Sequence, residues 1–288
     1  MKHYQRVLTI AGSDPSGGAG IQADIKTISS CGAYAMSAIT AITVQNTLGV
    51  QSVFPLPEQV VVDQIDAVLS DIGVDAVKIG MLHSASLMRE VAAVLEKHKV
   101  SRIVLDPVMV STSGHKLIQD DAIKTLQEVL IPMATVITPN VPEAEVLLGQ
   151  RIEGEEAFKD AAYALSLGGK VSVYMKAGHV EERVLKDIFF NAERGSHLPL
   201  LEKRIETCNT HGTGCTLSSA FASYLAKGME LQLAAIYAKD YVNNAIIAGS
   251  TYEIGHGHGP VCHFFEEDWT VKTQNYTELK GTVVRSTR

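Results

Sequence analysis

Short apolar stretches alternate with longer amphipathic stretches along most of this 288-residue chain. The apolar stretches have the length and β-branched content of buried strands, and the amphipathic stretches between them have the period of helices. Because each strand is followed by a helix, neighbouring strands must run parallel, with the helices packed against the sheet. The pattern therefore predicts an α/β fold with a mostly parallel central sheet and helices on both faces.

The boundaries of these elements follow from the same pattern. Strands are predicted at residues 6–11, 35–45, 75–80, 101–110, 134–140 and 171–176, and a hairpin at 187–191 and 198–204. Helices are predicted at 21–31, 57–71, 86–99, 122–130, 155–167, 213–227 and 231–249, with another beginning near 143. In the first helix Ile21, Ile25 and Ile28 form the expected core stripe, and Asp24 falls outside it. No repeat or linker divides the chain, so we expect one domain over residues 1–270 and a polar tail over 271–288.

Composition excludes several classes of partner and compartment. The net charge is −7 and no basic stripe is present, which argues against nucleic acid as a partner. No apolar run reaches the length of a membrane span, and the first residues lack the apolar core of a signal peptide. The four cysteines (Cys31, Cys208, Cys215 and Cys262) show no CxxC spacing. This favours free thiols in a reducing cytoplasm over a disulfide framework or a zinc site.

The sequence NTHGTGC at residues 209–215 predicts an anion site at the start of the helix 213–227. Gly212 and Gly214 permit a close approach of backbone to ligand, and the first N–H groups of a helix attract phosphate. Cys215 lies in the first turn, where the field of the helix is expected to lower the pKa of its thiol. The alternative is structural, because small residues at a helix start also serve tight packing and most cysteines are inert.

Several residues lie at or near the carboxyl ends of the predicted strands, at the edge of the sheet where ligands bind. These strand-end residues are Gly12, Gln45, Met81, Asp106, Asn140 with Glu143, and Lys176. Together they suit phosphoryl transfer, which needs phosphate-binding groups, a metal ion and a proton acceptor. Asp106 and Glu143 can hold Mg²⁺, and Lys176 can reach phosphate oxygens. Taken singly, a lysine at a strand end is usually a solvated surface charge, and Asp106 before a proline could serve only to form a turn.

The helix start supplies the remaining parts of this chemistry. The backbone N–H groups of Gly212, Thr213 and Gly214 can stabilise developing negative charge, and a Cys215 thiolate can take the proton of an alcohol. The glycine-rich loop at residues 12–20 is neither a Walker A sequence nor a dinucleotide fingerprint. Asp24, close to this loop, either faces a ligand or is a solvated surface residue.

Seven motifs resemble those of a known family. They are AGSDPSGGAGIQAD (11–24), TVQNT (43–47), KIGML (78–82), VLDPVM (104–109), TPNVPE (138–143), HGTGCT (211–216) and GHGHGP (255–260). Between about residues 5 and 268, the chain resembles the ribokinase-like superfamily, and within it the hydroxymethylpyrimidine kinases of thiamin biosynthesis. The resemblance implies a three-layer sandwich, a homodimer, and the use of ATP and Mg²⁺. It also implies that the loop 111–116 closes over the site. Too little sequence follows residue 268 for a thiamin-phosphate synthase, so no such fusion is expected.

The resemblance further implies a role for each site residue. Gln45 would read the pyrimidine edge, and four residues would line the substrate pocket: Gly12, Asp24, Met81 and Val108. Asn140, Lys176 and Thr213 would bind ATP, and Asp106 and Glu143 would hold Mg²⁺. Gly212, Gly214 and Cys215 would form the anion hole and, with Lys176, the catalytic set. Cys215 stands where most sugar kinases of the superfamily have aspartate, which agrees with a substrate that is not a sugar.

The implied reaction is the phosphorylation of 4-amino-5-hydroxymethyl-2-methylpyrimidine to its monophosphate and then to its diphosphate. A pyridoxal kinase of the same fold is the alternative, because both substrates are flat heterocycles with a hydroxymethyl arm. The Gln45 amide favours the aminopyrimidine, since it can pair with a ring nitrogen and its adjacent amino group. A non-catalytic ligand-binding protein is a further alternative, which the complete set of Asp106, Glu143, Lys176 and Cys215 disfavours.

Overall fold

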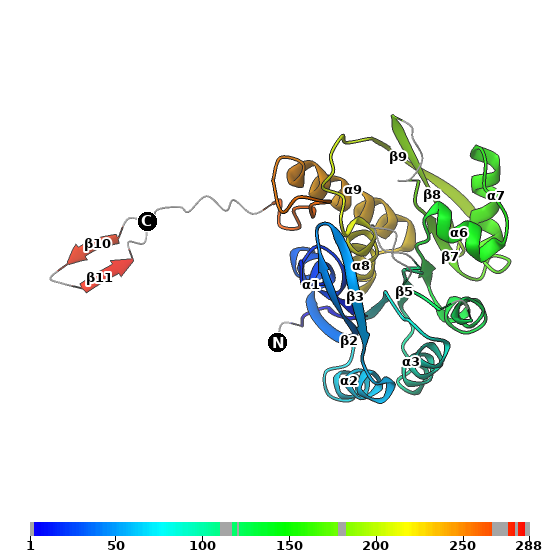
Figure 1. Cartoon of the computed structure of the whole chain (residues 1–288), viewed down its shortest axis with the longest axis horizontal. Helices are drawn as coiled ribbons and strands as arrows, with labels where there is room; N and C mark the ends of the chain where they lie inside the picture. Colours follow the sequence, from blue (N-terminus) through cyan, green and yellow to red (C-terminus); the bar gives the residue numbers. More distant parts are fainter. Residues whose placement is uncertain are drawn as a thin grey trace.

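A mixed sheet of nine strands is the centre of the computed structural model (Figure 1). The structure describes residues 3–109, 117–119, 121–177 and 183–266, and the backbone of 276–279 and 282–285. The sheet contains β1 (Arg6–Ser13), β2 (Tyr34–Asn46), β3 (Gly49–Pro55), β4 (Ala76–Ile79), β5 (Ile103–Leu105), β6 (Val136–Ile137), β7 (Ser172–Met175), β8 (Val184–Asn191) and β9 (Ser196–Lys203). Their order is β3-β2-β1-β4-β5-β6-β7-β8-β9. The six neighbouring strands β2, β1, β4, β5, β6 and β7 run parallel to one another. At one edge β3 is antiparallel to β2; at the other edge β8 is antiparallel to β7, and β9 to β8.

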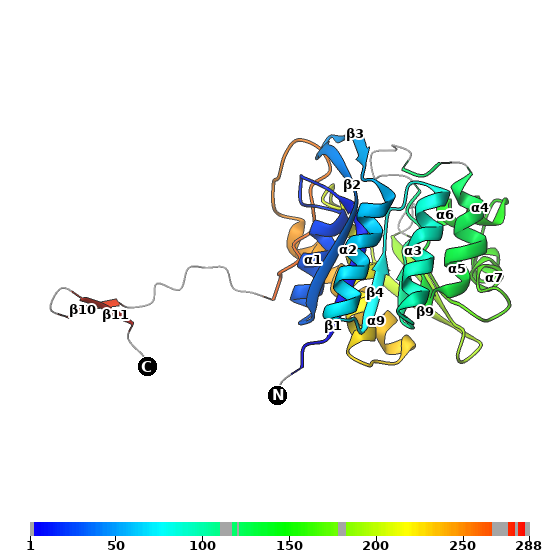
Figure 2. The same cartoon turned by 90° about the horizontal axis from the view of Figure 1, so that it is seen from below.

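Helices cover both faces of this sheet, as the alternating pattern predicted. One face carries α1 (Gly20–Ser30), α8 (Thr213–Ala226) and α9 (Leu231–Gly249). The other carries α2 (Glu58–Asp71), α3 (Ala85–Lys97), α6 (Val141–Leu148), α7 (Glu155–Leu165) and one continuous helical segment made of α4 (Ala122–Thr125), the π-helix η1 (Leu126–Leu130) and α5 (Ile131–Met133). Figure 2 shows α2 and α3 side by side across the sheet. The predicted three-layer α/β sandwich is confirmed.

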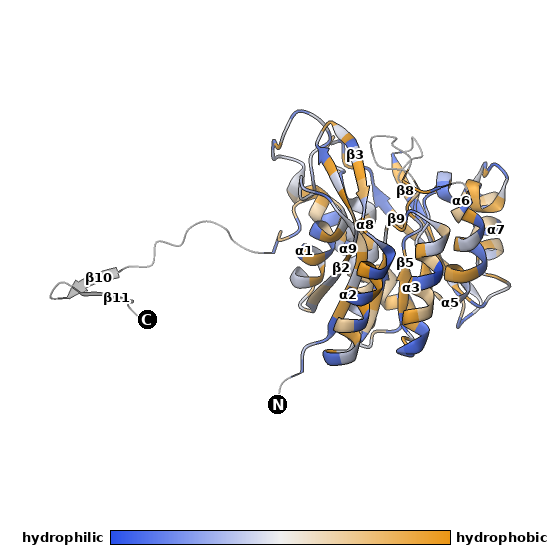
Figure 3. Ribbon diagram, turned by 60° about the horizontal axis from the view of Figure 1, so that its bottom comes forward, coloured by the Kyte–Doolittle hydropathy of each residue, from blue (hydrophilic) through white to orange (hydrophobic). Residues whose placement is uncertain are grey.

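Alternate residues of the central strands enter opposite hydrophobic cores. In β5, Val104 packs with α8 and α9, whereas Ile103 and Leu105 pack with the helices of the other face. This is the two-residue period of a strand buried on both sides. Figure 3 shows the hydrophobic residues along the central strands and much of the hydrophilic surface on helices and loops. The result is a rigid frame whose strand ends hold the site.

Three features differ from the predicted elements. Strand β3 was not predicted; it pairs antiparallel with β2 at the exposed edge of the sheet. In α1 the stripe prediction is confirmed for Ile21 and Ile28, which are buried, but it is wrong for Ile25, which is exposed. Asp24, expected outside the stripe, is completely buried. Asp24 lies three residues after Ile21 and four before Ile28, on the same helix face, and a buried cation compensates its charge. Two short strands, β10 (Tyr276–Leu279) and β11 (Thr282–Arg285), form a hairpin within the segment expected to be a polar tail.

Among the residues that the structure describes, no helix combines the length and apolarity needed to cross a bilayer. The cysteines at 31, 208, 215 and 262 are free thiols, as predicted.

Candidate active site

Three charged side chains from separate elements meet at the carboxyl edge of the sheet. Asp106 directly follows β5, Lys176 follows β7, and Glu143 lies in the first turn of α6. The Lys176 Nζ lies 2.9 Å from Asp106 Oδ1 and 3.8 Å from Glu143 Oε2. The structure thus brings together three residues that the sequence identified only as separate strand-end groups.

The start of α6 fixes Glu143 within this cluster. Asn140 is the N-cap residue, and its side-chain oxygen accepts the Glu143 N–H at 2.8 Å. The Glu143 carboxylate accepts the Asn140 N–H at 2.8 Å, which completes a capping box. The Lys176 N–H donates to the Pro139 carbonyl, which ties the end of β7 to the same turn. The expected ATP-binding residue Asn140 therefore has a structural role as well.

Burial and neighbouring charges shift the pKa values of the three groups in this cluster in different directions. Burial would raise the pKa of Asp106, but Lys176 and Lys78 hold it below its usual value. Burial would lower the pKa of Lys176, but Asp106 and Glu143 keep it raised. Burial raises the pKa of Glu143 to about 7, against the attraction of Lys176, and Asp106 adds to the rise. The cluster therefore holds one ionised pair and one carboxyl that titrates near neutral pH.

We expect Glu143→Gln to stabilise the fold at pH 8 relative to the unchanged chain. A carboxyl with a raised pKa favours folding when it is protonated, and this contribution is lost as the pH rises from about 4.5 through about 7. The difference in free energy of unfolding between variant and unchanged protein should move by about 2 kcal/mol between pH 5 and pH 8. Urea unfolding at both pH values measures it, with the exposed Glu128→Gln as control. A difference that does not change with pH would contradict the assignment.

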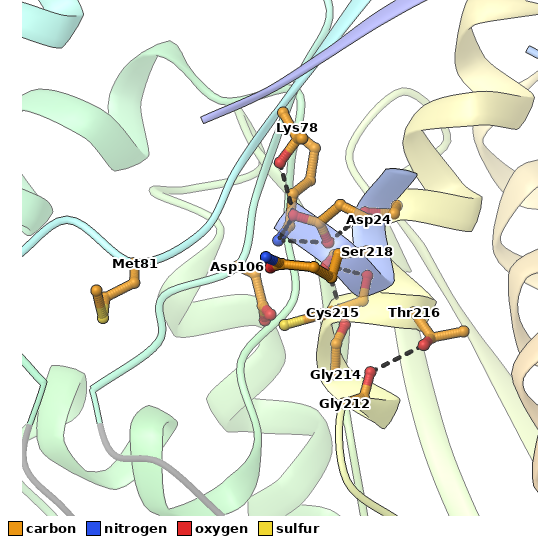
Figure 4. Close-up of polar contacts among 12 residues, drawn as sticks. Asp24, Lys78, Met81, Asp106, Gly212, Gly214, Cys215, Thr216 and Ser218 are labelled. Carbon is orange, nitrogen blue, oxygen red and sulfur yellow. Dashed lines mark hydrogen bonds and ion pairs between the residues drawn. The ribbon is translucent and has the colours of Figure 1, made fainter. Parts of the chain in front are cut away.

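The start of α8 lies beside Asp106 of this cluster (Figure 4). Gly212 caps the helix with φ +83°, and a Cβ there would lie 1.7 Å from the Gly18 carbonyl oxygen. A Cβ on Gly214 would lie 3.4 Å from Lys176 Nζ and 3.6 Å from Asp106 Oδ2. Backbone, lysine and carboxylate therefore border one space that can receive an anion. Thr213 is the first residue of α8; its N–H donates to the Thr210 carbonyl at 3.3 Å.

Cys215 is partly exposed, and Figure 4 shows its sulfur on the side facing Asp106. Burial raises the pKa of the Cys215 thiol to about 11; Lys78 opposes the rise, whereas Asp24 and Asp106 add to it. The expectation of a lowered pKa is therefore wrong. The field of a helix start is a partial charge, and here desolvation and two neighbouring carboxylates outweigh it.

A buried ion pair close to Cys215 was missed by the sequence analysis. The Lys78 Nζ lies 2.9 and 3.0 Å from the two Asp24 oxygens, and both side chains are fully buried. Thr9 and Ser219 also donate hydrogen bonds to this carboxylate. Asp24 thus has only protein partners, and the expectation that it lines the substrate pocket is not supported. The available signal was a lone lysine within the otherwise apolar strand β4.

Breaking this pair should destabilise the fold strongly. Lys78→Met is expected to lower the free energy of unfolding by about 3–5 kcal/mol, because it leaves the Asp24 carboxylate buried without a cation. The double variant Asp24→Leu/Lys78→Met removes both charges and should regain about half of that loss. Denaturant unfolding of the unchanged protein, the single variant and the double variant measures these free energies. If the single and double variants are equally unstable, packing rather than charge sets the effect.

The other expected substrate residues are Gly12, Met81, Val108 and Gln45. A Cβ on Gly12 would lie 2.6 Å from Met81 Cε, so these two residues are in contact. Val108 is partly exposed, and its N–H donates to the Asp106 carbonyl at 2.8 Å. Gln45, near the end of β2, is partly exposed, and its side-chain nitrogen is placed 3.4 Å from His211 Nε2. Gln45 is therefore adjacent to the loop that leads into α8.

The glycine-rich segment at residues 255–260 contacts both the turn after β2 and the loop before α8. Its Gly257 and His258 N–H groups donate to Thr47, in the β2–β3 turn, and the Gly259 carbonyl accepts the His211 N–H. A Cβ on Gly257 would lie 2.0 Å from the Thr47 carbonyl oxygen. The glycines thus allow the segment to fit between the turn that follows Gln45 and the loop before α8.

The donor set is compatible with a magnesium ion bound together with phosphates. Within the described residues, no group of three or more His, Cys, Asp or Glu side chains could hold a metal by itself. Mg²⁺ commonly uses one or two carboxylates and completes its shell with phosphate and water. Asp106 and Glu143 meet that requirement. The loop 111–116, expected to close over the site, lies outside the described residues.

Comparison with known proteins identifies the family of the chain. Residues 14–262 match the family model "Phosphomethylpyrimidine kinase". A hydroxymethylpyrimidine/phosphomethylpyrimidine kinase of Rhizobium meliloti is 48% identical over 89% of this chain and 96% of its own. The bifunctional thiamine biosynthesis protein ThiED of Geobacter sulfurreducens is 46% identical over 89% of this chain, which spans only 52% of that protein.

Solved structures with this fold include the pyridoxal kinase of Staphylococcus aureus in complex with AMP-PCP and pyridoxal. It superposes with a TM-score of 0.82 at 34% identity, covering 92% of this chain and 95% of its own. The fold is therefore ribokinase-like. From the extent of the family match and the shared fold, the chain belongs to the phosphomethylpyrimidine kinase family.

Proposed function

We propose that this protein transfers the γ-phosphate of ATP to the hydroxymethyl group of 4-amino-5-hydroxymethyl-2-methylpyrimidine, and then phosphorylates the monophosphate to the diphosphate. The observation that carries the proposal is the position of Lys176. Its ammonium is held between Asp106 and Glu143, next to the glycine-lined start of α8. Such a site suits phosphoryl transfer, which depends on positioning and charge stabilisation.

Each part of the site has a proposed role. Asn140, Lys176 and Thr213 bind the phosphates of ATP. Asp106 and Glu143 would hold Mg²⁺, which neutralises phosphate charge when bound. The amides around Gly212 and Gly214 stabilise charge on the transferred phosphoryl group.

The substrate ring lies between Gln45 on one side and Gly12, Met81 and Val108 on the other. The alcohol oxygen attacks the γ-phosphorus, the bond from that phosphorus to the bridging oxygen breaks, and ADP leaves.

Cys215 remains the proposed acceptor of the alcohol proton. With its pKa raised to about 11, the side chain is a thiol at neutral pH, so only a small fraction of the protein is active in the first step. The second step needs no such base, because its acceptor is a phosphate that is already ionised. The two steps should therefore depend differently on pH.

The chief alternative substrate is pyridoxal, because the S. aureus pyridoxal kinase, whose structure was solved in complex with AMP-PCP and pyridoxal, shares the fold. Two observations favour the pyrimidine. The identity is higher with hydroxymethylpyrimidine kinases than with that structure, 48% against 34%. Gln45 also offers a donor and an acceptor side by side, the pattern that an aminopyrimidine edge complements.

Product analysis tests the proposal. The purified protein is incubated with Mg-ATP and either the aminopyrimidine alcohol or pyridoxal, and the products are followed by mass spectrometry. Mono- and then diphosphate from the pyrimidine are expected. Phosphate found only on pyridoxal would assign the protein to vitamin B6 salvage.

A homodimer and a cytoplasmic location are also proposed. Exposed apolar side chains on β2 and β3, namely Ile42, Val44 and Phe54, support an interface on that edge of the sheet. Light scattering after size exclusion measures the mass, and a monomer would contradict the proposal.

A further inference from the structure

A buried aspartate–histidine pair lies directly beside the proposed ring-reading residue. His211 Nε2 is 2.8 Å from Asp14 Oδ2, and both side chains are buried. The pKa of Asp14 is lowered to about 2, because His211, Ser16 and Ala19 donate hydrogen bonds that outweigh its burial. The carboxylate is therefore ionised and accepts a hydrogen bond, so the Nε2 of His211 must carry a hydrogen.

This hydrogen constrains the carboxamide of Gln45. Its terminal atom facing His211 is 3.4 Å from Nε2, and its other terminal atom is 3.1 Å from Thr43 Oγ1. A nitrogen facing His211 would set two donors against each other. An oxygen there would instead be a second, weaker acceptor that shares the Nε2 hydrogen with Asp14.

Thr43 independently favours the same orientation of the Gln45 carboxamide. Its hydroxyl lies 3.0 Å from the Ser13 carbonyl, to which it can donate its single hydrogen. The Thr43 oxygen is then an acceptor towards Gln45, which requires the amide nitrogen on that side. Both neighbours thus favour the same orientation, with oxygen towards His211 and nitrogen towards Thr43.

We infer that the Asp14–His211 pair sets the orientation of the Gln45 carboxamide, and thereby the order in which Gln45 presents a donor and an acceptor to the substrate ring. His211 and Asp14 are accordingly positioning residues that determine specificity, an inference that rests on the proposed function. Gln45 is partly exposed, so one N–H and one oxygen lone pair are left for a ligand.

The order of donor and acceptor matters because the substrate ring is asymmetric. Going away from the hydroxymethyl group, the aminopyrimidine presents an amino donor and then a ring-nitrogen acceptor. Its 4-oxo analogue presents a carbonyl acceptor and then an N–H donor, which is the reverse order. A carboxamide held in one orientation can pair with only one of the two compounds while the hydroxymethyl arm is directed towards Cys215. A carboxamide that is free to rotate by a half-turn accepts both.

The segment at residues 255–260 supports this arrangement mechanically. It bonds to the His211 N–H through Gly259 and to Thr47 through Gly257 and His258. The backbone of His211 is therefore held relative to the turn that follows Gln45. This assigns a purpose to a glycine-rich motif that the phosphoryl-transfer residues leave unused.

The test compares kcat/KM for the 4-amino alcohol and its 4-oxo analogue. The unchanged protein should prefer the amino compound by about 100-fold or more, because the wrong order leaves buried polar groups unpaired. His211→Leu and Asp14→Asn should each reduce this preference at least about tenfold, since either change lets the carboxamide turn. His211→Gln, which keeps a donor towards Asp14, should retain most of it.

The two kcat/KM values are measured on the same preparation of each variant. A loss of folded protein therefore lowers both equally and does not change their ratio. A preference that stays unchanged in both His211→Leu and Asp14→Asn, with both rates reduced equally, would overturn the inference and leave a structural role only. An unchanged protein that phosphorylates neither pyrimidine would overturn the proposed function itself.

Discussion

Lys176→Met is expected to lower kcat by about 10³-fold, with a much smaller change in the affinity for the pyrimidine. Lys176 is the cation that Asp106 and Glu143 hold beside the start of α8, where charge on the transferred phosphoryl group must be stabilised. Methionine keeps much of the side-chain volume and removes only the charge and its hydrogen bonds. Steady-state kinetics with Mg-ATP measure the effect.

The same substitution should also change how stability depends on pH. Without the lysine, two buried carboxyl groups face each other, and their pKa values rise. The free energy of unfolding should therefore fall more steeply between pH 6 and pH 8 than in the unchanged protein. Lys186→Met, in an exposed pair with Glu155, is the matched control and should leave kcat unaltered. Equal kinetics for the two variants would remove Lys176 from the catalytic set.

Gly212→Ala is expected to destabilise the protein severely and to abolish its activity. The added Cβ would lie 1.7 Å from the Gly18 carbonyl oxygen, a backbone atom that can move only with the glycine-rich loop. Displacing that loop separates the start of α8 from the strand-end residues, so the anion site is lost together with the packing.

Gly228 offers a control with almost the same backbone conformation. Its φ is +79°, against +83° for Gly212, but nothing lies within 4 Å of an added Cβ. Gly228→Ala should cost only the strain of a left-handed alanine, about 1–2 kcal/mol. Gly212→Ala should cost about 3 kcal/mol more. Chemical denaturation and the kinase assay compare them. If the two costs are equal, then the close approach to Gly18 does not matter.

Much of the fold could be predicted because strand and helix periods are local properties. The runs that became β1, β4, β5 and β7 are apolar and end in residues with useful chemistry, so their convergence followed from parallel topology alone. Strand β3 escaped prediction because it is an exposed edge strand without a clear buried face. Its partner β2 supplies the hydrogen bonds that its own sequence does not reveal.

The site was predicted less completely, because its electrostatics depend on contacts between distant residues. Asp24 and Lys78 are 54 positions apart, and Asp14 and His211 are 197 apart. Neither pair has a spacing that a single sequence can expose. The pKa of Cys215 was predicted in the wrong direction for the same reason. The helix start is visible in sequence, whereas burial and the nearby carboxylates are not.

The most direct test of the account is the pH dependence of the two phosphorylation steps, measured separately. One reaction starts from the pyrimidine alcohol and the other from its monophosphate, each with Mg-ATP, between pH 6.5 and pH 9.5. Titration of Glu143 affects both steps and cancels in their ratio. With Cys215 as proton acceptor, the ratio of the first rate to the second should rise about tenfold per pH unit. A ratio independent of pH would show that the Cys215 thiolate does not activate the alcohol, and no phosphorylation of either pyrimidine would contradict the proposed function as a whole.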